Sequence, residues 1–152
     1  MIGNQPFHIL LVEDEIADAQ LTIMGLRDAK VPSQVHHVLT GAAMLEFLFE
    51  SEIASSSLPR PDLILLDLNM PEMNGREVLK KVKEHFSFRD IPLIVLSTSD
   101  DPRTIQYCYQ NGANSYICKP INVSENFWAM KIMVEYWAAV ASAPRHQRKR
   151  QG

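Results

Sequence analysis

The sequence DLILLDLNMPEMNG, residues 62–75, decides the fold class of this chain. Its apolar run LILL, at 63–66, is followed at once by Asp67. A short, unbroken apolar run is typical of a parallel strand that helices cover on both faces. A carboxylate at the point where such a strand leaves the core is costly unless it is paired or bound to a metal ion. Asp67 is therefore the first candidate for a functional residue.

Apolar runs and amphipathic stretches alternate along the remainder of the chain. Further strands are predicted at 7–12, 35–38, 93–96 and 115–118. Helices are predicted from the spacing of apolar residues at about 16–29, at 42–49, after Gly75, at 102–112 and at 123–141. Strands that alternate with helices imply parallel strands joined by right-handed crossovers. The pattern therefore predicts an α/β fold of five βα units.

Length and charge limit the possible classes of protein. A chain of 152 residues suits one domain, which we expect at 7–142, after an N-terminal extension at 1–6. The formal net charge is −3 although four cationic residues lie near the C-terminus, so the remaining chain is more acidic still. An acidic body argues against nucleic acid binding. We expect the basic segment 143–152 to be a solvated, disordered tail.

The chain carries no pattern typical of membrane or secreted proteins. No apolar run approaches the roughly 20 residues that span a bilayer, and the first residues lack the pattern of a signal peptide. We therefore expect a cytoplasmic protein that does not contact membranes. Cys108 and Cys118 have no metal-ligand spacing and lie in apolar patterns, so we expect both to be small buried residues in the reduced form.

Polar residues follow four of the five predicted strands. They are Glu13-Asp14-Glu15, Asp67-Leu68-Asn69, Ser97-Thr98 and Lys119-Pro120. In open α/β sheets, the crevice that binds ligands lies at the carboxyl ends of the strands. Taken singly these residues are ambiguous, because an acid such as Asp14 or Glu15 can cap a helix. Together they indicate one site.

The chemistry of this set favours phosphoryl transfer to Asp67. Three converging carboxylates repel one another, and a hard divalent cation such as Mg²⁺ relieves the repulsion. Asp67 can then attack phosphorus as a nucleophile. The cation and the ammonium group of Lys119 can share the charge of the phosphoryl oxygens, and the Ser97 hydroxyl can hydrogen-bond the product.

Four motifs together resemble those of response-regulator receiver domains, the chemotaxis-receiver-like modules of two-component signalling. They are LLVEDE at 10–15, DLILLDLNMPEMNG at 62–75, IPLIVLSTS at 91–99 and GANSYICKP at 112–120. The resemblance covers about residues 7–142, with the motifs in the right order and spacing. It implies a flavodoxin-like (βα)5 three-layer sandwich with a parallel five-stranded sheet in the order 2-1-3-4-5.

The resemblance also implies a role for each residue that matches a motif. Asp67 would be the phosphoacceptor. Glu13, Asp14, Asp67 and the backbone carbonyl of Asn69 would bind Mg²⁺ or Mn²⁺. Ser97 and Lys119 would bind the phosphoryl group, and Ser97 and Tyr116 would form the conformational switch. The Lys119–Pro120 peptide bond would be cis.

A narrower resemblance involves the segment 59–83 and the aromatic residues of the last helix. These are similar to small stand-alone cyanobacterial regulators that partner phytochrome-type histidine kinases. The resemblance implies a sensor histidine kinase as partner and a homodimer through the last two helices and the last strand. That face would include Tyr107, Tyr116, Phe127, Trp128, Tyr136 and Trp137.

The aromatic residues have a second interpretation, in which they pack in the core. We expect this of Phe127 and Ile132. Tyr136 and Trp137 cannot easily both point inward, because adjacent helical residues point about 100° apart. One of the two rings is therefore expected to face a partner or solvent.

Two other functions fit parts of the pattern. A Mg²⁺-dependent phosphatase of the haloacid dehalogenase type also uses a strand-end aspartate, but it needs a second aspartate two positions later. This chain has Asn69 at that position. A receiver-like scaffold that no longer takes phosphate is the other alternative. The preferred hypothesis is a phosphoacceptor signalling protein rather than an enzyme.

Overall fold

A computed structural model describes residues 5–69 and 75–144 of the chain. Several sequence predictions fall outside these ranges. They concern residues 1–4 of the N-terminal extension, residues 70–74 of the motif that contains Asp67, and the cationic residues of the tail. Among the described residues, no helix is long and apolar enough to cross a membrane.

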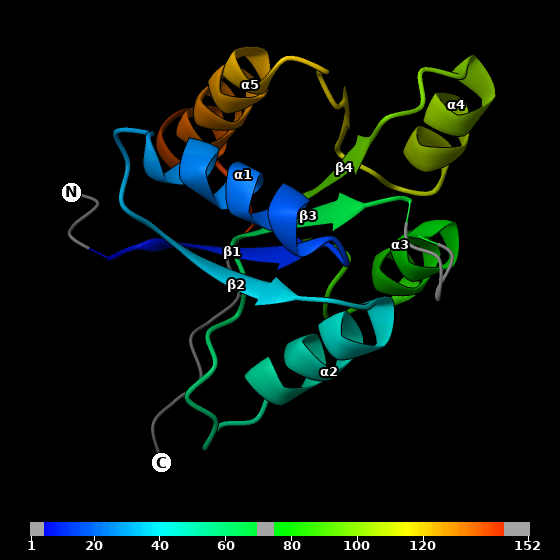
Figure 1. Cartoon of the computed structure of the whole chain (residues 1–152). Helices are drawn as coiled ribbons and strands as arrows, with labels where there is room; N and C mark the ends of the chain where they lie inside the picture. Colours follow the sequence, from blue (N-terminus) through cyan, green and yellow to red (C-terminus); the bar gives the residue numbers. More distant parts are fainter. Residues whose placement is uncertain (1–4, 70–74, 145–152) are drawn as a thin grey trace.

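Strands and helices alternate along the described chain in the predicted order (Figure 1). The strands are β1 (Phe7–Val12), β2 (Ser33–Val38), β3 (Leu63–Asp67), β4 (Leu93–Ser97) and β5 (Ser115–Cys118). The helices are α1 (Ile16–Arg27), α2 (Gly41–Ser51), α3 (Gly75–Glu84), α4 (Pro102–Gln110), α5 (Val123–Glu135) and the π-helical turn η1 (Tyr136–Val140). The strands form one parallel sheet in the order β2-β1-β3-β4-β5. The predicted flavodoxin-like fold is confirmed.

Helices cover both faces of this sheet and form two apolar cores. On β1, Leu10 and Val12 face the core under α2, α3 and α4, while Ile9 and Leu11 face the core under α1 and α5. Figure 1 shows α1 and α5 together on one side and α2 and α3 on the other. Successive residues of a strand point to opposite faces, so a strand buried on both faces must be apolar at every position. This explains the unbroken apolar runs of the sequence.

The ends of several helices follow from side-chain chemistry. The Thr40 hydroxyl accepts a hydrogen bond from the backbone N–H of Ala43 at the start of α2. Asp101 caps α4 in the same way, and Pro102 occupies its first turn, as predicted. Gly112 follows α4 with a φ of 100°, a conformation that favours glycine. These local signals hold each connection in place between the sheet and the next helix.

Two predictions about burial are wrong. Cys108 is buried, but Cys118 is exposed because it ends β5, which lies at the edge of the sheet. Ile132 was expected in the core, yet it is 45% exposed on the outer side of α5. Trp137 instead packs against the core beneath α1 and α5. An apolar residue on a helix identifies a candidate core position, and only the packing of that helix decides which face is covered.

Candidate metal centre

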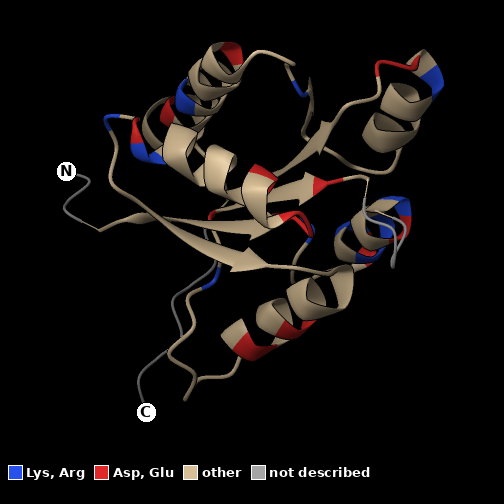
Figure 2. Cartoon of the chain, in the orientation of Figure 1, with Lys and Arg blue, Asp and Glu red and all other residues tan. Residues whose placement is uncertain are grey.

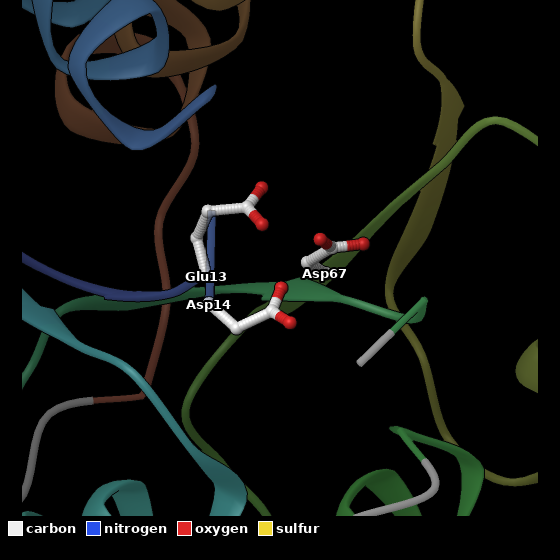
Figure 3. A group of neighbouring side chains, drawn as sticks. All are labelled: Glu13, Asp14 and Asp67. Carbon is white, nitrogen blue, oxygen red and sulfur yellow. The ribbon is translucent and has the colours of Figure 1, made fainter. Parts of the chain in front are cut away.

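Three acidic side chains meet where β1 and β3 end. Oxygen atoms of Glu13, Asp14 and Asp67 all lie within 4.8 Å of one another, and Figure 3 shows the three carboxylates side by side. β1 and β3 are neighbouring parallel strands, so their carboxyl ends share one edge of the sheet, where acidic residues gather (Figure 2). Glu13 and Asp67 are only 1% and 3% exposed. The structure therefore brings together the three predicted carboxylates.

These acids are not explained as helix caps. Glu15 occupies the N-cap position of α1, but its side chain makes no capping hydrogen bond there. Its backbone N–H instead donates to Glu13 Oε2 at 3.2 Å. The Glu15 N–H therefore helps to hold the Glu13 carboxylate inside the cluster.

Lys119 brings a positive charge to the cluster from the end of β5. Its Nζ lies 3.1 Å from Glu13 Oε1 and 3.4 Å from Asp67 Oδ2. Burial alone would lower the pKa of Lys119, but the charges of Asp67 and Glu13 outweigh this effect and raise it above its ordinary value. The amine therefore stays protonated, and it bridges two buried acids that belong to different strands.

Glu13 has the most perturbed acid–base equilibrium of the site. Burial, together with a hydrogen bond to Asp67, raises the pKa of its carboxyl group to about 8, against the lowering effect of Lys119. One ammonium group thus does not fully compensate the buried acids. Glutamate and aspartate oxygens are the ligands that hard divalent cations prefer, so the donor set fits Mg²⁺ or Mn²⁺.

The raised pKa of Glu13 predicts a pH-dependent stability of the metal-free protein. Its folded pKa of about 8 lies above the ordinary value of 4.5, so the folded chain holds a proton that the unfolded chain releases. This contribution to stability is complete below pH 4.5 and is lost as the pH rises through 8. We expect the free energy of unfolding, measured by urea titration in EDTA, to fall across this window.

The matched variant for this experiment is Glu13→Gln, which cannot release the proton. Its free energy of unfolding should depend less on pH between 4.5 and 8 than that of the unmodified protein. Equal slopes for the two proteins would contradict the assignment of the raised pKa to Glu13.

Asn69 and Thr98 form a link across the site that the sequence did not reveal. The Asn69 side-chain amide donates to Thr98 Oγ1 at 3.1 Å, and its backbone N–H donates to Asp67 Oδ1 at 3.0 Å. Asn69 thereby fixes one Asp67 oxygen and also joins the ends of β3 and β4. Coordination by the Asn69 carbonyl remains a prediction.

The predicted switch residues lie on either side of the loop that follows β4. Ser97 is fully buried, and its Oγ accepts a hydrogen bond from the Ser99 backbone N–H at 3.1 Å. The half-buried Tyr116 donates from its hydroxyl group to the Ser99 carbonyl at 2.7 Å. Its backbone N–H donates to the Tyr109 hydroxyl at 3.1 Å. Ser99 therefore contacts both predicted switch residues, and no sequence signal pointed to Tyr109.

The peptide bond that joins Lys119 to Pro120 differs from its prediction. No cis peptide bond occurs among residues 5–69 and 75–144, so this bond is trans. The family resemblance had implied cis. The trans form is favoured before proline by only about 0.5–1 kcal/mol, so sequence alone cannot fix the isomer.

The predicted dimer-face residues divide into two groups. Trp128 and Tyr136 are 64% and 50% exposed, and together with Ile132 and Val140 they form a stripe at intervals of four residues along α5 and η1. Tyr107, Tyr116 and Phe127 are half-buried, as is the core-packed Trp137. The expectation that Tyr136 and Trp137 point different ways is confirmed, with Tyr136 outward.

A parallel sheet of this order, with three carboxylates and a lysine at its carboxyl edge, defines a receiver-type signalling domain. The sequence model of the family "Response regulator receiver domain" matches residues 9–130. The chain belongs to this family.

Several relatives resemble the chain over nearly its full length. "Response regulator Rcp1" from Synechocystis sp. is 34% identical over 142 residues, which cover 93% of this chain and 96% of Rcp1. A crystal structure of the Mn²⁺-bound form of Rcp1 aligns with a TM-score of 0.82 at 33% identity, covering 92% of this chain and 100% of that one. The crystal structure of the phosphorylated cyanobacterial phytochrome response regulator RcpA gives a TM-score of 0.84 at 38% identity, covering 93% and 100%.

A relative with a different description has the same sequence identity to this chain as Rcp1. The "Probable methanogenesis regulatory protein FilR2" of Methanothrix harundinacea is 34% identical over 142 residues, which cover 93% of this chain and 90% of FilR2. The relatives are therefore all described as regulators, but the description of RcpA names phytochrome whereas that of FilR2 names methanogenesis.

Proposed function

We propose that this chain is a single-domain response regulator that accepts a phosphoryl group from a histidine kinase on Asp67. The observation that carries the proposal is the cluster of Glu13, Asp14 and Asp67 at the carboxyl edge of the sheet, in which Lys119 bridges the buried Glu13 and Asp67. It combines a nucleophile, a donor set for a divalent cation and a fixed ammonium group. Phosphoryl transfer to a carboxylate needs these three components.

Each side chain has a defined part in the proposed reaction. A carboxylate oxygen of Asp67 attacks the phosphorus of a phosphohistidine, so an O–P bond forms as the P–N bond breaks and the imidazole leaves. Lys119 supplies positive charge beside the Asp67 oxygens, and the Asn69 N–H orients one of them. Glu13, Asp14 and Asp67 would hold Mg²⁺, which supplies charge neutralisation at the phosphoryl oxygens when bound. The Mn²⁺-bound form of Rcp1 supports a divalent cation here.

The switch in this proposal starts from the hydrogen bonds at Ser99. When Asp67 carries a phosphoryl group, the Ser97 hydroxyl turns toward it and gives up the hydrogen bond from the Ser99 N–H. The Tyr116 hydroxyl then leaves the Ser99 carbonyl, and its ring moves into the space beside Ser97. This movement alters the face of α4, β5 and α5, and so biases a two-state equilibrium of the domain.

Phosphorylation and its dependence on a metal ion can be tested together. The protein is incubated with acetyl phosphate and Mg²⁺, and its intact mass is measured. We expect a population with one added phosphoryl group. Chelation by EDTA should abolish it, because the buried acids then repel the incoming anion. Full incorporation in EDTA would contradict the metal-dependent mechanism, and no added mass in Mg²⁺ would favour the scaffold alternative.

The kinase partner is proposed to be a phytochrome-type histidine kinase. The protein is proposed to be located in the cytoplasm. RcpA, which is 38% identical to this chain, is described as a phytochrome response regulator. Phosphotransfer from purified kinases tests this proposal. Faster labelling of this chain by a phytochrome-type kinase than by an unrelated sensor kinase would support it, and the reverse order would contradict it. Nucleic acid is not proposed as a partner, because the chain is acidic.

The signalling output is proposed to be self-association through the exposed stripe of Trp128, Ile132, Tyr136 and Val140 on α5 and η1. Large exposed apolar side chains in one row are typical of interfaces. We expect Trp128→Ser or Tyr136→Ser to shift the protein toward monomer in size-exclusion chromatography, before or after phosphorylation. Phe86→Ser is the matched control, because Phe86 is 74% exposed but lies outside this face. An equal shift in the control would contradict the assigned interface.

A further inference from the structure

Two histidines lie together on neighbouring strands, away from the acidic site. His8 is in β1 and His36 is in β2, and the register pairs His36 with Leu10. His8 Nδ1 lies 3.2 Å from His36 Nε2, and both side chains are half-buried. The ring of Phe47 from α2 lies 5.3 Å from that of His36. Two imidazole nitrogens therefore face each other beside an apolar surface.

The spacing of these nitrogens suits a shared metal ion. Histidine binds Zn²⁺ at about 2.0–2.1 Å, so two nitrogens 3.2 Å apart subtend an angle of roughly 100° at the metal, close to a tetrahedral angle. Imidazole is a preferred ligand of Zn²⁺, Ni²⁺ and Cu²⁺, whereas carboxylates prefer Mg²⁺ and Mn²⁺. The histidine pair and the acidic cluster thus differ in the cations they select.

The acid–base equilibrium of His36 also suits metal binding. Burial lowers the pKa of His36, and the neighbouring His8 lowers it further. A metal ion requires the neutral imidazole, which has a free lone pair. One hydrogen lies between the two nitrogens in the metal-free pair, and it moves to the other nitrogen of the same ring when the metal binds. Two neutral imidazoles therefore bind the ion without a net release of protons.

The pair is separate from the acidic cluster. His8 precedes Glu13 by five residues along β1, a separation of roughly 16 Å in an extended strand. It shares a strand face with Leu10 and Val12, which pack beneath α2 and α3. A metal ion bound by His8 and His36 would therefore not overlap the acidic cluster at the carboxyl edge of the sheet.

We propose that His8 and His36 form a second metal site, which binds one cation of the Zn²⁺ class and clips β2 to β1. In the sheet formed by the described residues, β2 is an edge strand, and its neighbouring strand is β1. An ion that bridges the two strands adds a cross-link at this edge, and water completes its coordination. Binding to the folded chain stabilises it by an amount that rises with the logarithm of the free Zn²⁺ concentration once that concentration exceeds the Kd.

The experiment is a Zn²⁺ titration of the full, untagged chain by calorimetry, with excess Mg²⁺ present to occupy the acidic cluster. We expect one Zn²⁺ per chain at this site. His8→Gln and His36→Gln should each weaken binding by at least roughly tenfold, because each removes one arm of a chelate. The double variant should bind little less than either single variant. Zn²⁺ should also raise the unfolding temperature of the unmodified protein, but not that of the variants.

The control variant is His85→Gln, which removes a histidine packed among Phe49, Phe86 and Phe88 rather than beside a second ligand. It should bind Zn²⁺ as the unmodified protein does. Unchanged binding in both His8→Gln and His36→Gln would overturn the proposal. So would the absence of binding to the unmodified chain, or an equal loss in His85→Gln. The circular dichroism spectrum of each variant is compared with that of the unmodified protein. A loss of binding in a variant with an unchanged spectrum is assigned to the missing ligand.

Discussion

Asp67→Asn is expected to abolish phosphorylation by acetyl phosphate completely. The substitution keeps the shape of the side chain but removes the negative charge and the nucleophilic oxygen. The Asn69 N–H donates to Asp67 Oδ1 at 3.0 Å, and Lys119 Nζ lies 3.4 Å from Asp67 Oδ2. Glu13, the other buried acid of the cluster, is not expected to replace it, because its Oε1 is paired with Lys119. Intact mass spectrometry should detect no added phosphoryl group.

The matched control is Asp62→Asn, which makes the same change just before the opposite end of β3. The Asp62 carboxylate accepts a hydrogen bond from the His8 backbone N–H and lies outside the acidic cluster. This variant should be phosphorylated like the unmodified protein. A full phosphoryl addition in Asp67→Asn would show that another residue is the acceptor and would overturn the proposed function.

Gly75→Ala is expected to destabilise the fold by about 3 kcal/mol, at the upper end of the usual cost of overpacking. A Cβ at this position would lie 2.7 Å from the Leu68 carbonyl oxygen and 2.8 Å from Leu68 Cα. Both atoms belong to the backbone directly after Asp67, so they cannot move without distorting the site. This cost outweighs the roughly 1 kcal/mol by which alanine is favoured over glycine in a helix.

Urea denaturation measures this effect, with Gly25→Ala as the comparison. At Gly25 in α1 the closest atom to a new Cβ would be Met130 Cβ, at 3.1 Å. A small separation of α1 from α5 relieves that contact, so the loss of stability should be smaller. Gly75→Ala should also slow phosphorylation, because Leu68 adjoins Asp67. If Gly75→Ala had the same denaturation midpoint as the unmodified protein, this would contradict the close approach of Gly75 to the Leu68 backbone.

The sequence predicted the fold and the acidic centre well because both follow from local periodicity. Unbroken apolar runs indicate strands covered on both faces, and an alternating βα order requires parallel strands. Parallel strands place their carboxyl ends at one edge. Glu13, Asp14 and Asp67 were therefore expected at the same edge, even though more than 50 residues separate Asp14 from Asp67. The four motifs added the sheet order through family resemblance.

Side-chain contacts between distant segments were beyond the reach of these rules. The sequence did not predict that Lys119 bridges Glu13 and Asp67, that Asn69 binds Thr98, or that Tyr109 accepts the Tyr116 N–H. It also misplaced Cys118 and Ile132, because apolar character does not show which face of an element a neighbour covers.

The sequence by itself thus determined the order of the elements, the two-faced burial of the sheet and the edge at which its acids gather. The tertiary structure alone decided how charge is balanced within the site, which aromatic residues remain exposed, and that His8 lies against His36. The physical reason is the range of each interaction. Periodicity acts through neighbours in the chain, whereas hydrogen bonds and ion pairs depend on atomic distances that strand register and helix packing set.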